Sequence, residues 1–526
     1  MQREAFLRAA TSRRSPYDVI VIGGGANGLG IALDCAHRGL EVLLLERAAF
    51  GAGTSSRSSK LIHGGIRYLA QAQFGLVREA LHERALLLRN AAGLVTPLPF
   101  ILPAGKRLEL YKYAAGLKLY DALAGEHKLS TSRILDSTET RRLAPQLGRA
   151  PLVGSVSYTD AHFDDTRLLQ ALAHSAAARG ATLLNHMPVV ALHKNARGQL
   201  RAVGVRDALG GATHDFEARV IINASGVHGD AVRRLADATL EAEILPSQGT
   251  HLVVPNRFYS SGHALVMPRT PDGRVMFVMP WHGQALIGTT DTALDKLVDP
   301  PVPQREEIDM ILTVTARHLH RAPSRSDVLS AFAGVRPLAA APGSARSSKI
   351  SREHAISVDS AGLVTVSGGK WTTYRRVAEQ CVDVAVKLAG LRARDVSTRE
   401  LELVTPDSAR GGVDALGFPA RGVAHIGAEQ AALAAPLSDA LPYSGAHFAY
   451  AARYEMAMTV ADALAYHTRA LFIDARAALD IAPRVATIMA NELQRDTNWV
   501  ASELAALRSI AAPFILTPTP VRETRG

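Results

Sequence analysis

The segment Tyr17–Glu46 constrains the fold more than any other part of the chain. A β-branched run, Asp18–Ile22, leads into the cluster Gly23-Gly24-Gly25-Ala26-Asn27-Gly28, which fits the pattern GxGxxG. Apolar residues at helical spacing follow over Ala26–Arg38, and Glu41–Leu45 forms a second apolar run. Continuous apolar runs of this length are typical of buried parallel strands. The order strand, glycine turn, helix, strand predicts a dinucleotide-binding unit.

Each residue of the glycine cluster has an expected role in such a unit. Gly23 permits the tight turn, Gly25 lets a pyrophosphate approach the backbone, and Gly28 lets the helix pack closely on the sheet. Asn27 lies at the helix N-terminus, where free N–H groups bind phosphate. Glu46 ends the second strand, where a carboxylate accepts hydrogen bonds from a ribose diol and repels the 2′-phosphate of NADP. The pattern therefore predicts FAD or NAD and does not separate the two.

Three regions are predicted along the chain. A series of short strands separated by turns indicates an antiparallel sheet distinct from the parallel one: His251–Val254, Ala264–Pro268, Arg274–Trp281 and Ala285–Thr289. Gln71–Ala92 is predicted to be helical, and Pro97, Pro99 and Pro103 are expected to break that helical pattern. The Ala-rich stretch Phe448–Leu507 predicts a helical C-terminal domain. We assign 17–95, 160–235 and 330–388 to the dinucleotide domain, 96–159 and 236–329 to a second domain, and 389–526 to a linker and the helical domain.

Composition narrows the class of partner. Lys plus Arg total 59 and Asp plus Glu 49, a formal charge of +10 that suits nucleic acid, an anionic membrane surface or a phosphorylated substrate. No nucleic-acid recognition motif accompanies this charge, so we expect no nucleic-acid partner. Cys35 and Cys381 have neither metal nor redox spacing, which predicts a reducing compartment and no bound metal. No run of about 18 apolar residues occurs, so we expect no transmembrane helix.

Four stretches carry long and distinctive residue patterns. They are TSSRSSKLIHGGIRYL at 54–69, FAGVRPL at 332–338, SREH at 351–354 and SGGKWTTYR at 367–375. Together they closely resemble the FAD-dependent glycerol-3-phosphate dehydrogenase family, the respiratory, quinone-linked enzymes rather than the NAD-linked ones. The resemblance runs from about Asp18 to Leu388 and continues around Arg453–Leu493.

The resemblance implies a fold and a reaction. The fold is α/β, with a Rossmann-like FAD-binding domain of glutathione-reductase type, an inserted antiparallel-sheet substrate domain and an α-helical C-terminal domain. The reaction is oxidation of sn-glycerol 3-phosphate to dihydroxyacetone phosphate, by hydride transfer to flavin N5 and reoxidation by a membrane quinone. Neither composition nor spacing establishes these points.

Cations inside the matched stretches are expected to bind the substrate phosphate. The substrate is a dianion, and the planar fork of Arg donates two parallel hydrogen bonds to phosphate. The resemblance places Arg67, Tyr68, Arg336, Arg352 and Lys370 in the substrate pocket. Arg274, in the predicted antiparallel sheet, is added as a substrate-binding candidate.

The resemblance also assigns cofactor contacts outside the first glycine cluster. The loop that follows the second strand is expected to wrap FAD, because small hydroxyl side chains and close backbone suit pyrophosphate and flavin. The candidates in this loop are Ser55, Ser58, Ser59, Lys60 and Gly64. Gly226, in a turn after a later strand, and Gly334, Gly369 and Thr372, where backbone can lie near the flavin ring, are further candidates.

Oxidation of the substrate hydroxyl requires a base for its proton. His63, inside the first matched stretch, and His251, which opens the antiparallel series, are the candidates, because imidazole titrates near working pH. Lys370 and Arg336 are further catalytic candidates, since Lys370 can stabilise the developing alkoxide. In Ser247–His251 the sequence has Gln248 where many family members carry a cation, which leaves the details of the phosphate site open.

Other functions remain open at this stage. One is a glycerol-phosphate oxidase that uses oxygen, and another is a related flavoenzyme acting on a different 2-hydroxy acid or an amine. A third is a flavin-binding module without catalysis, whose helical tail serves as an interaction platform. Anaerobic mixing with glycerol 3-phosphate separates the module from the enzymes, because only an enzyme bleaches the flavin.

Membrane contact is expected to be peripheral. The stretch Leu108–Leu123 mixes apolar and basic residues and is predicted to form an amphipathic helix suited to an anionic lipid surface. We therefore expect a cytoplasmic protein, peripheral on the cytoplasmic face of the inner membrane. Whether the protein forms a homodimer is left open.

Overall fold

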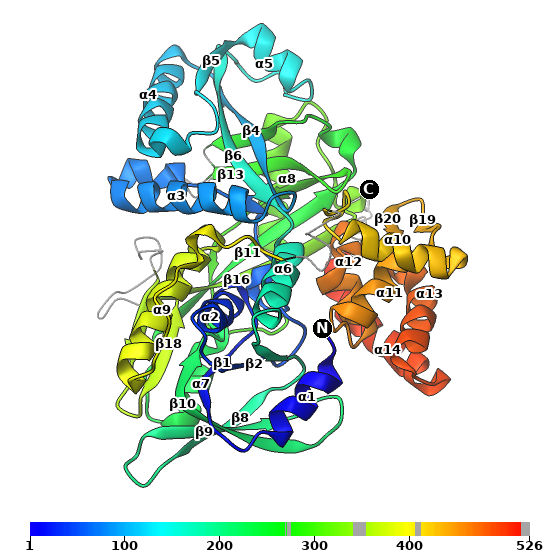
Figure 1. Cartoon of the computed structure of the whole chain (residues 1–526). Helices are drawn as coiled ribbons and strands as arrows, with labels where there is room; N and C mark the ends of the chain where they lie inside the picture. Colours follow the sequence, from blue (N-terminus) through cyan, green and yellow to red (C-terminus); the bar gives the residue numbers. More distant parts are fainter. Residues whose placement is uncertain (269, 271–274, 340–353, 405–411, 517–526) are drawn as a thin grey trace, which may run out of the picture.

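The computed structural model describes residues 1–268, 270, 275–339, 354–404 and 412–516, with the side chains of Arg67 and Ala70 left out. Two large sheets and a helical C-terminal region make up this part of the chain (Figure 1). The predicted α/β fold is confirmed, and the second sheet is larger than expected because it also takes strands from segments assigned to the dinucleotide domain.

The first sheet contains the predicted dinucleotide unit. Its parallel core has the order β18-β10-β1-β2-β7, and β17 pairs antiparallel with β18 at one edge. An antiparallel extension adds β8 and β9 to the long strand β10. The strands are β1 (Tyr17–Ile22), β2 (Val42–Leu45), β7 (Thr182–Leu184), β8 (Val189–Lys194), β9 (Leu200–Arg206), β10 (Thr213–Asn223), β17 (Ala355–Val358) and β18 (Leu363–Ser367).

Helices cover both faces of this sheet, as the fully apolar strands require. On one face, α2, α6 and α9 pack together with β1, β2 and β18 in a single apolar cluster, and the two free cysteines lie buried within it. Glycine at position 30 of α2 allows the close approach of Tyr374 on α9. The helices around the sheet are α1 (Arg3–Ser12), α2 (Ala26–His37), α6 (Asp165–Ala177), α7 (Gly229–Ala236) and α9 (Tyr374–Ala389).

The second sheet is mixed rather than purely antiparallel, because β12 runs parallel to β4. The four predicted short strands appear as β11 to β14, and β16 pairs with β11 over its whole length. The strands are β3 (Leu61–Ile62), β4 (Val95–Ala104), β5 (Arg133–Asp136), β6 (Gly154–Phe163), β11 (Ile244–Val254), β12 (Ala264–Pro268), β13 (Val275–Trp281), β14 (Gln284–Gly288), β15 (Thr292–Ala293) and β16 (Ser330–Ala339). The structural border therefore differs from the assigned one, since β6 and β16 end or begin inside the ranges given to the dinucleotide domain.

As predicted, no helix runs through Pro97, Pro99 and Pro103, but the segment that carries them is a regular strand. All three lie in β4, which pairs with β6 along its entire length. Proline has no N–H to donate, but residues two apart in a strand direct their N–H groups to the same edge. The odd-numbered prolines therefore share the edge away from β6, where β12 pairs only with Phe100 and Ile101.

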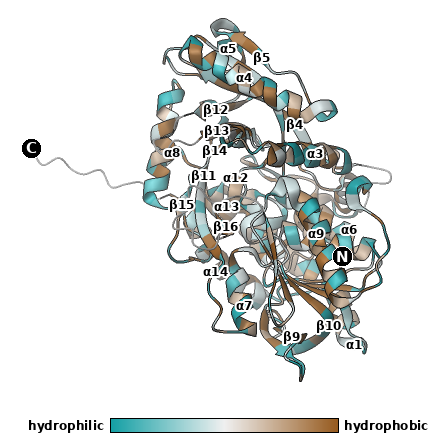
Figure 2. Cartoon of the chain, turned by 90° about the vertical axis from the view of Figure 1, so that its left-hand side faces the viewer, coloured by the Kyte–Doolittle hydropathy of each residue, from teal (hydrophilic) through white to brown (hydrophobic). Residues whose placement is uncertain are grey.

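Four helices cover this second sheet, and α4 lies at its far end (Figures 1 and 2). They are α3 (Phe74–Asn90), α4 (Arg107–Ala124), α5 (Ser137–Leu143) and α8 (Arg305–His318). The predicted amphipathic helix is confirmed as α4, whose inner face packs into the core through Leu110, Leu117 and Tyr120. Within the described residues, no helix combines the length and hydropathy that a membrane crossing needs.

The predicted helical C-terminal domain is confirmed and carries a small two-stranded sheet as well. Its elements are α10 (Ala420–Glu429), β19 (Pro436–Ser438), β20 (Leu441–Ser444), α11 (Gly445–Tyr454), η10 (Asp462–His467), α12 (Ala470–Ile473), α13 (Ala475–Leu493) and α14 (Thr497–Ala511). Arg167 of α6 donates two hydrogen bonds to the carboxylate of Glu455, at 2.7 and 2.8 Å, and lies over the ring of Phe418. This buried ion pair fixes the domain against the first sheet.

A second contact between the two regions depends on pH. His186, whose φ of 52° is left-handed, shares a 2.7 Å hydrogen bond with Asp462. Burial lowers the pKa of His186, but the Asp462 carboxylate outweighs it by charge and hydrogen bonding, so the folded pKa lies above the usual value. The stabilisation is thus fully present below the pKa of the unfolded state and is lost as pH rises through the raised folded pKa.

Exchanging His186 for asparagine is expected to flatten this dependence. Asparagine tolerates left-handed backbone and does not titrate. Between about pH 6 and about pH 9, the melting temperature of the wild type should fall more steeply than that of His186→Asn, by about 2 °C for each kcal/mol lost. Differential scanning calorimetry at both pH values gives the slopes, and parallel slopes would rule out this contribution.

Candidate active site

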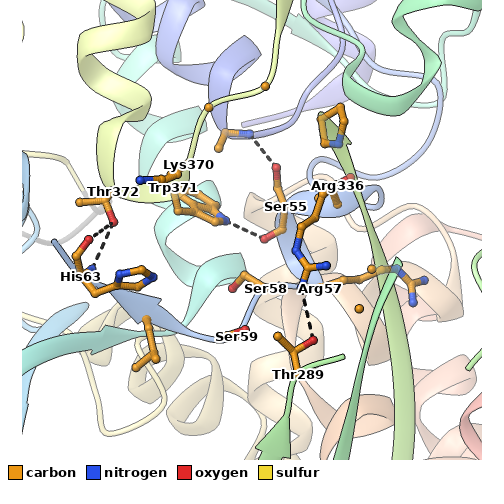
Figure 3. A pocket seen from close by; sticks show the side chains of 18 of the residues that line it. Ser55, Arg57, Ser58, Ser59, His63, Thr289, Arg336, Lys370, Trp371 and Thr372 are labelled. Atoms are coloured by element: carbon orange, nitrogen blue, oxygen red, sulfur yellow. Dashed lines mark hydrogen bonds between the residues drawn. The ribbon is translucent and has the colours of Figure 1, made fainter. Parts of the chain in front are cut away.

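A cavity of about 890 Å³ lies between the two sheets. The carboxyl ends of three neighbouring parallel strands reach it: Gly23 follows β1, Ser225 follows β10 and Gly368 follows β18. In open α/β sheets, ligands bind outside these carboxyl ends. The inner face of the second sheet closes the other side with residues of β11 and β16. Figure 3 shows Arg336 of β16 among them.

The end of the cavity beside β1 has the form of a dinucleotide site. Gly23, Gly25 and Asn27 line it, and the hydroxyl of Ser55 accepts a hydrogen bond from Ala26 N–H, at 2.9 Å. A Cβ on Gly25 would lie 2.9 Å from that hydroxyl, so a side chain there would crowd the loop. Because Gly25 has no side chain, a phosphate group has room to approach the backbone N–H groups at the start of α2.

Glu46 also lines this end of the cavity. Its carboxylate accepts hydrogen bonds from Gly24 N–H at 2.6 Å and from Ala48 N–H at 2.9 Å. Burial raises the pKa of Glu46, and the two N–H donors oppose that rise. The side chain is therefore held at the end of β2, in the place expected for a ribose contact.

Three segments distant in sequence meet where the flavin ring is expected. Trp371 donates its indole N–H to Ser55 carbonyl oxygen at 2.8 Å (Figure 3). Thr372 accepts from His63 N–H at 3.2 Å, and its own hydroxyl donates to His63 carbonyl oxygen at 3.3 Å. Asn27 reaches the carbonyl oxygen of Gly368, at 3.5 Å. The size of the cavity, the glycine turns and the N-terminus of α2 together fit FAD.

Arg336 lies on β16 with its guanidinium at the cavity. It forms an ion pair with Asp291 at 3.3 Å and donates to the carbonyl oxygen of Thr290 at 3.2 Å and the hydroxyl of Thr289 at 3.4 Å. A Cβ on Gly249 would lie 2.4 Å from the guanidinium, so glycine on β11 leaves room for this side chain. These contacts hold the cation in one place while it faces the cavity.

Lys370 and Tyr68 bring a second cation to the cavity. The ammonium of Lys370 lies over the Tyr68 ring, 3.9 Å from its centroid, and both residues line the cavity. Among the other substrate-binding candidates, Arg67 lies in the short helix η2 (Ile66–Gln71), and the structure describes its backbone only. Arg274 and Arg352 lie outside the described residues.

Gln248, at the position where many family members carry a cation, does not line the cavity. Its buried amide donates to Glu307 at 2.8 Å and to the carbonyl oxygen of Val302 at 3.0 Å. Glu307 also accepts from the hydroxyls of Thr250, Thr290 and Thr292. This network supports the Thr289–Asp291 turn that holds Arg336. Nothing in the local sequence around Glu307 predicts this role, because strand pairing brings the partners together.

His251 lies against the cavity and is firmly packed. Its Nε2 shares a 2.9 Å hydrogen bond with the Ser59 hydroxyl, and its ring stacks on Phe332 at 5.0 Å. Burial lowers the pKa of His251 well below its usual range, and the charges of Lys60 and Arg336 lower it further. The imidazole is therefore neutral at working pH and has a lone pair to accept a proton.

This shifted pKa predicts how activity depends on pH if His251 is the base. Only the neutral ring accepts a proton, so kcat/KM is expected to stay flat through about pH 6.5 and to decline only at lower pH. His251→Asn should remove that acidic limb and lower the plateau by about 10²-fold. If the limb stays in the variant, another group is the base, and the same profile for His63→Asn then tests the other candidate.

The turn that carries His63 is fixed from α4. Tyr120 accepts a hydrogen bond from Gly64 N–H at 2.8 Å and donates to Asp160 at 2.8 Å. Arg84 completes the buried group by binding Asp160 at 2.6 Å. His63 itself lines the cavity, so this group sets the position of a candidate base without touching the cavity through Tyr120 or Arg84.

Most predicted cofactor contacts line the cavity, and three do not. Ser55, Ser58, Ser59, Gly226, Gly334, Gly369 and Thr372 line it together with Gly23, Gly25, Asn27 and Glu46. Gly28 and Gly64 lie behind it: Gly28 faces the carbonyl of Gly23, and Gly64 faces Tyr120 and Leu81. Glycine at both positions serves close packing of the cavity wall.

Lys60 is the third cofactor candidate that does not line the cavity. Its side chain is fully buried, and the ammonium donates to Asp165 at 2.5 Å and to the carbonyl oxygen of Ser56 at 2.8 Å. Burial, together with the charge of Arg469, lowers the pKa of Lys60 to about 7. The side chain of Lys60 thus binds Asp165 and does not line the cavity, and a contact between the Lys60 backbone and the cofactor stays a prediction.

Comparison with known proteins agrees with this geometry. Residues 18–375 match the FAD dependent oxidoreductase family, and residues 364–499 match the C-terminal domain of alpha-glycerophosphate oxidase. With the strand-end cavity that fits the cofactor, these matches define an FAD-dependent oxidoreductase.

Individual relatives narrow this class. The chain is 38% identical to the mitochondrial glycerol-3-phosphate dehydrogenase of Arabidopsis thaliana over 97% of this chain and 88% of that one. It is 38% identical to the human mitochondrial enzyme over 92% of this chain and 71% of that one. The chain belongs to the FAD-dependent glycerol-3-phosphate dehydrogenase family.

Solved structures share the fold. The glycerol-3-phosphate dehydrogenase of Bacillus halodurans, complexed with FAD, is 26% identical with a TM-score of 0.74, covering 98% of this chain and 99% of that one. The L-alpha-glycerophosphate oxidase of Mycoplasma pneumoniae, with FAD bound, is 20% identical with a TM-score of 0.56 over 75% of this chain and 100% of that one. The second likeness concerns the fold alone.

Proposed function

We propose that the protein oxidises sn-glycerol 3-phosphate to dihydroxyacetone phosphate. The observation that carries this proposal is the pair of cations, Arg336 and Lys370, on a cavity that also has the dinucleotide turn of Gly23 and Gly25. A phosphate dianion needs fixed cations, and the ion pair with Asp291 leaves Arg336 oriented rather than free to swing. Family membership supports the same substrate.

Each cavity residue has a separate task in this reaction. Arg336 and Lys370 bind the phosphate and orient the secondary hydroxyl, and His63 or His251 accepts the hydroxyl proton. Bound FAD supplies the acceptor for the hydride at N5. The ring of Phe332 stacks on His251 and shields that face of the imidazole from water.

Anaerobic mixing tests the proposal directly. Holoenzyme is mixed with sn-glycerol 3-phosphate while the absorbance of oxidised flavin is followed at about 450 nm. We expect bleaching with the phosphoester and much weaker bleaching with glycerol at equal concentration. A flavin that stays oxidised with the phosphoester would contradict the proposed substrate.

For the electron acceptor we propose a membrane quinone. The family relationship to mitochondrial dehydrogenases favours this acceptor over oxygen. A glycerol-phosphate oxidase would instead return its electrons to oxygen. Measuring peroxide formation against quinone reduction in one preparation separates the two, and stoichiometric peroxide without quinone reduction would establish the oxidase.

We also propose that the outer face of α4 contacts an anionic membrane on its cytoplasmic side. Leu108 is 66% exposed and Tyr111 63%, and the basic side chains of Lys112 and Lys118 lie on the same helix. Such a face suits a lipid interface. Flotation with anionic vesicles should carry the wild type upward and leave a Leu108→Ser, Tyr111→Ser variant behind. A wild type that stays at the bottom would contradict membrane attachment.

A further inference from the structure

The cavity cation Arg336 has an internal anion at its side. Oδ1 of Asp291 lies 3.3 Å from Nη1 of Arg336. Arg336 lines the cavity, whereas Asp291 does not. The side chains of Arg336 and Asp291 are 23% and 11% exposed, so solvent screens this ion pair less than it screens a pair on the surface. The charge of the guanidinium is therefore divided between a fixed carboxylate and any anion that enters the cavity.

Pairing of the strands fixes this carboxylate. Asp291 lies in the turn between β14 and β15, and β15 pairs with β11. Ser247 of β11 donates its hydroxyl to Asp291, and the same residue lies opposite Arg336 in the register of β11 with β16. The ion pair is thus built into the sheet, unlike one formed by two mobile side chains on a surface.

The orientation of Arg336 does not require a carboxylate. The carbonyl oxygen of Thr290 accepts a hydrogen bond from the guanidinium at 3.2 Å. The hydroxyl of Thr289 accepts a second one at 3.4 Å (Figure 3). These neutral acceptors hold the side chain and leave its charge unchanged. A carboxylate does more, because its charge also repels an anion that approaches the guanidinium.

Phosphate binding in this cavity has to be reversible. The proposed substrate and product carry the same phosphate group, so a contact with it stabilises both alike and leaves the barrier of the chemical step unchanged. Contacts of that kind, when very strong, delay the release of product. We propose that Asp291 sets the affinity of the cavity for phosphate monoesters by partly neutralising Arg336. This inference rests on the proposed function and names a residue that tunes the same site.

The sign of its effect distinguishes Asp291 from the cations around the cavity. Asp291→Asn keeps the size of the side chain and an amide oxygen that accepts from Arg336, but it removes the negative charge. The whole charge of the guanidinium then acts on the ligand. We expect the Kd of the oxidised holoenzyme for dihydroxyacetone phosphate to fall by about five- to tenfold, whereas loss of Arg336 raises it.

Titration calorimetry measures this Kd. Dihydroxyacetone phosphate is the probe because, as the proposed product, it binds to the oxidised enzyme without turnover. Asp295→Asn is the matched control, since Asp295 is exposed in the same segment, does not line the cavity and loses the same charge. We expect that variant to match the wild type. Dihydroxyacetone, which has no phosphate, should bind no more tightly to Asp291→Asn than to the wild type.

A purely orienting role for Asp291 predicts a different result. Arg336 would then lose its position in Asp291→Asn, and the Kd would rise or stay the same, and either outcome overturns the proposal. Asp291→Glu keeps the charge, and we expect its Kd to lie nearer to that of the wild type than to that of Asp291→Asn. Asp291→Ser is a second neutral variant, used if the amide disturbs folding, and it should also bind more tightly. Flavin content and melting temperature verify that each variant is folded.

The substrate proposal is judged by a separate measurement. Flavin reduction of the wild type by sn-glycerol 3-phosphate tests the reaction, and the Kd values of wild type and variant test Asp291. A wild type that bleaches with the phosphoester and binds dihydroxyacetone phosphate as tightly as Asp291→Asn keeps the proposed function and refutes the role of Asp291. A wild type without measurable affinity for dihydroxyacetone phosphate would refute this role as well.

Discussion

Replacing Arg336 by alanine is expected to lower kcat/KM for sn-glycerol 3-phosphate by about 10²- to 10⁴-fold. The guanidinium can give a phosphate two charge-assisted hydrogen bonds of about 1.5–3 kcal/mol each, and about 1.4 kcal/mol corresponds to a factor of ten. Its contacts with Thr289, Thr290 and Asp291 hold it at the cavity wall. Steady-state kinetics with a quinone acceptor measures the loss.

The chemistry of the phosphate provides the controls for this variant. Arg336→Lys keeps the charge but loses the fork, and we expect an intermediate loss. With glycerol, which has no phosphate, wild type and Arg336→Ala should differ little, because the removed contact is absent in both. Full activity of Arg336→Ala on the phosphoester would favour a flavoenzyme acting on another 2-hydroxy acid or an amine.

Gly28→Ala is expected to give protein almost free of flavin. A Cβ at this position would lie 1.8 Å from the carbonyl oxygen of Gly23, and the nearest obstacle is backbone that cannot rotate away. Either α2 must move off β1 or the turn between them must open, and both changes displace the N–H groups that face the pyrophosphate. The ratio of flavin to protein absorbance after purification measures the effect.

Gly75→Ala is the matched control for this change. Gly75 lies in the first turn of α3, where a Cβ would have no atom within 4 Å, and it does not line the cavity. We expect a normal flavin content for this variant. Gly28→Ala protein that purified fully yellow would show that the helix can shift without loss of the cofactor.

Local patterns in the sequence predicted the elements that depend on neighbours in the chain. The strand, glycine turn and helix of Tyr17–His37 follow from the spacing of apolar residues and from the sterics of glycine. Both signals can be read from one short stretch of the sequence. The short strands β11 to β14 were equally clear. The residues brought to the cavity by matched stretches, such as His63, Arg336 and Lys370, do line it.

The rest depends on contacts between distant parts of the chain. The strand β4 forms despite its prolines because β6 pairs with only one edge of β4, and the prolines face the other edge. Glu307 and Asp291 support Arg336 through pairing of β11 with its neighbours, and no local pattern marks them. Lys60 lies in a stretch that resembles a cofactor-binding loop. The direction of its side chain, however, is set by the carboxylate of Asp165, more than a hundred residues later in the chain.

Arg469 has a consequence for the timing of biosynthesis. Its guanidinium donates to the carbonyl oxygen of Ser56 at 2.7 Å and lies 3.7 Å from Asp165, next to the ammonium of Lys60. The loop that we expect to wrap the flavin is translated early, but this contact exists only after the ribosome has passed position 469. We therefore expect nascent chains to capture the yellow prosthetic group late, around their release, rather than while the nucleotide-binding half is emerging.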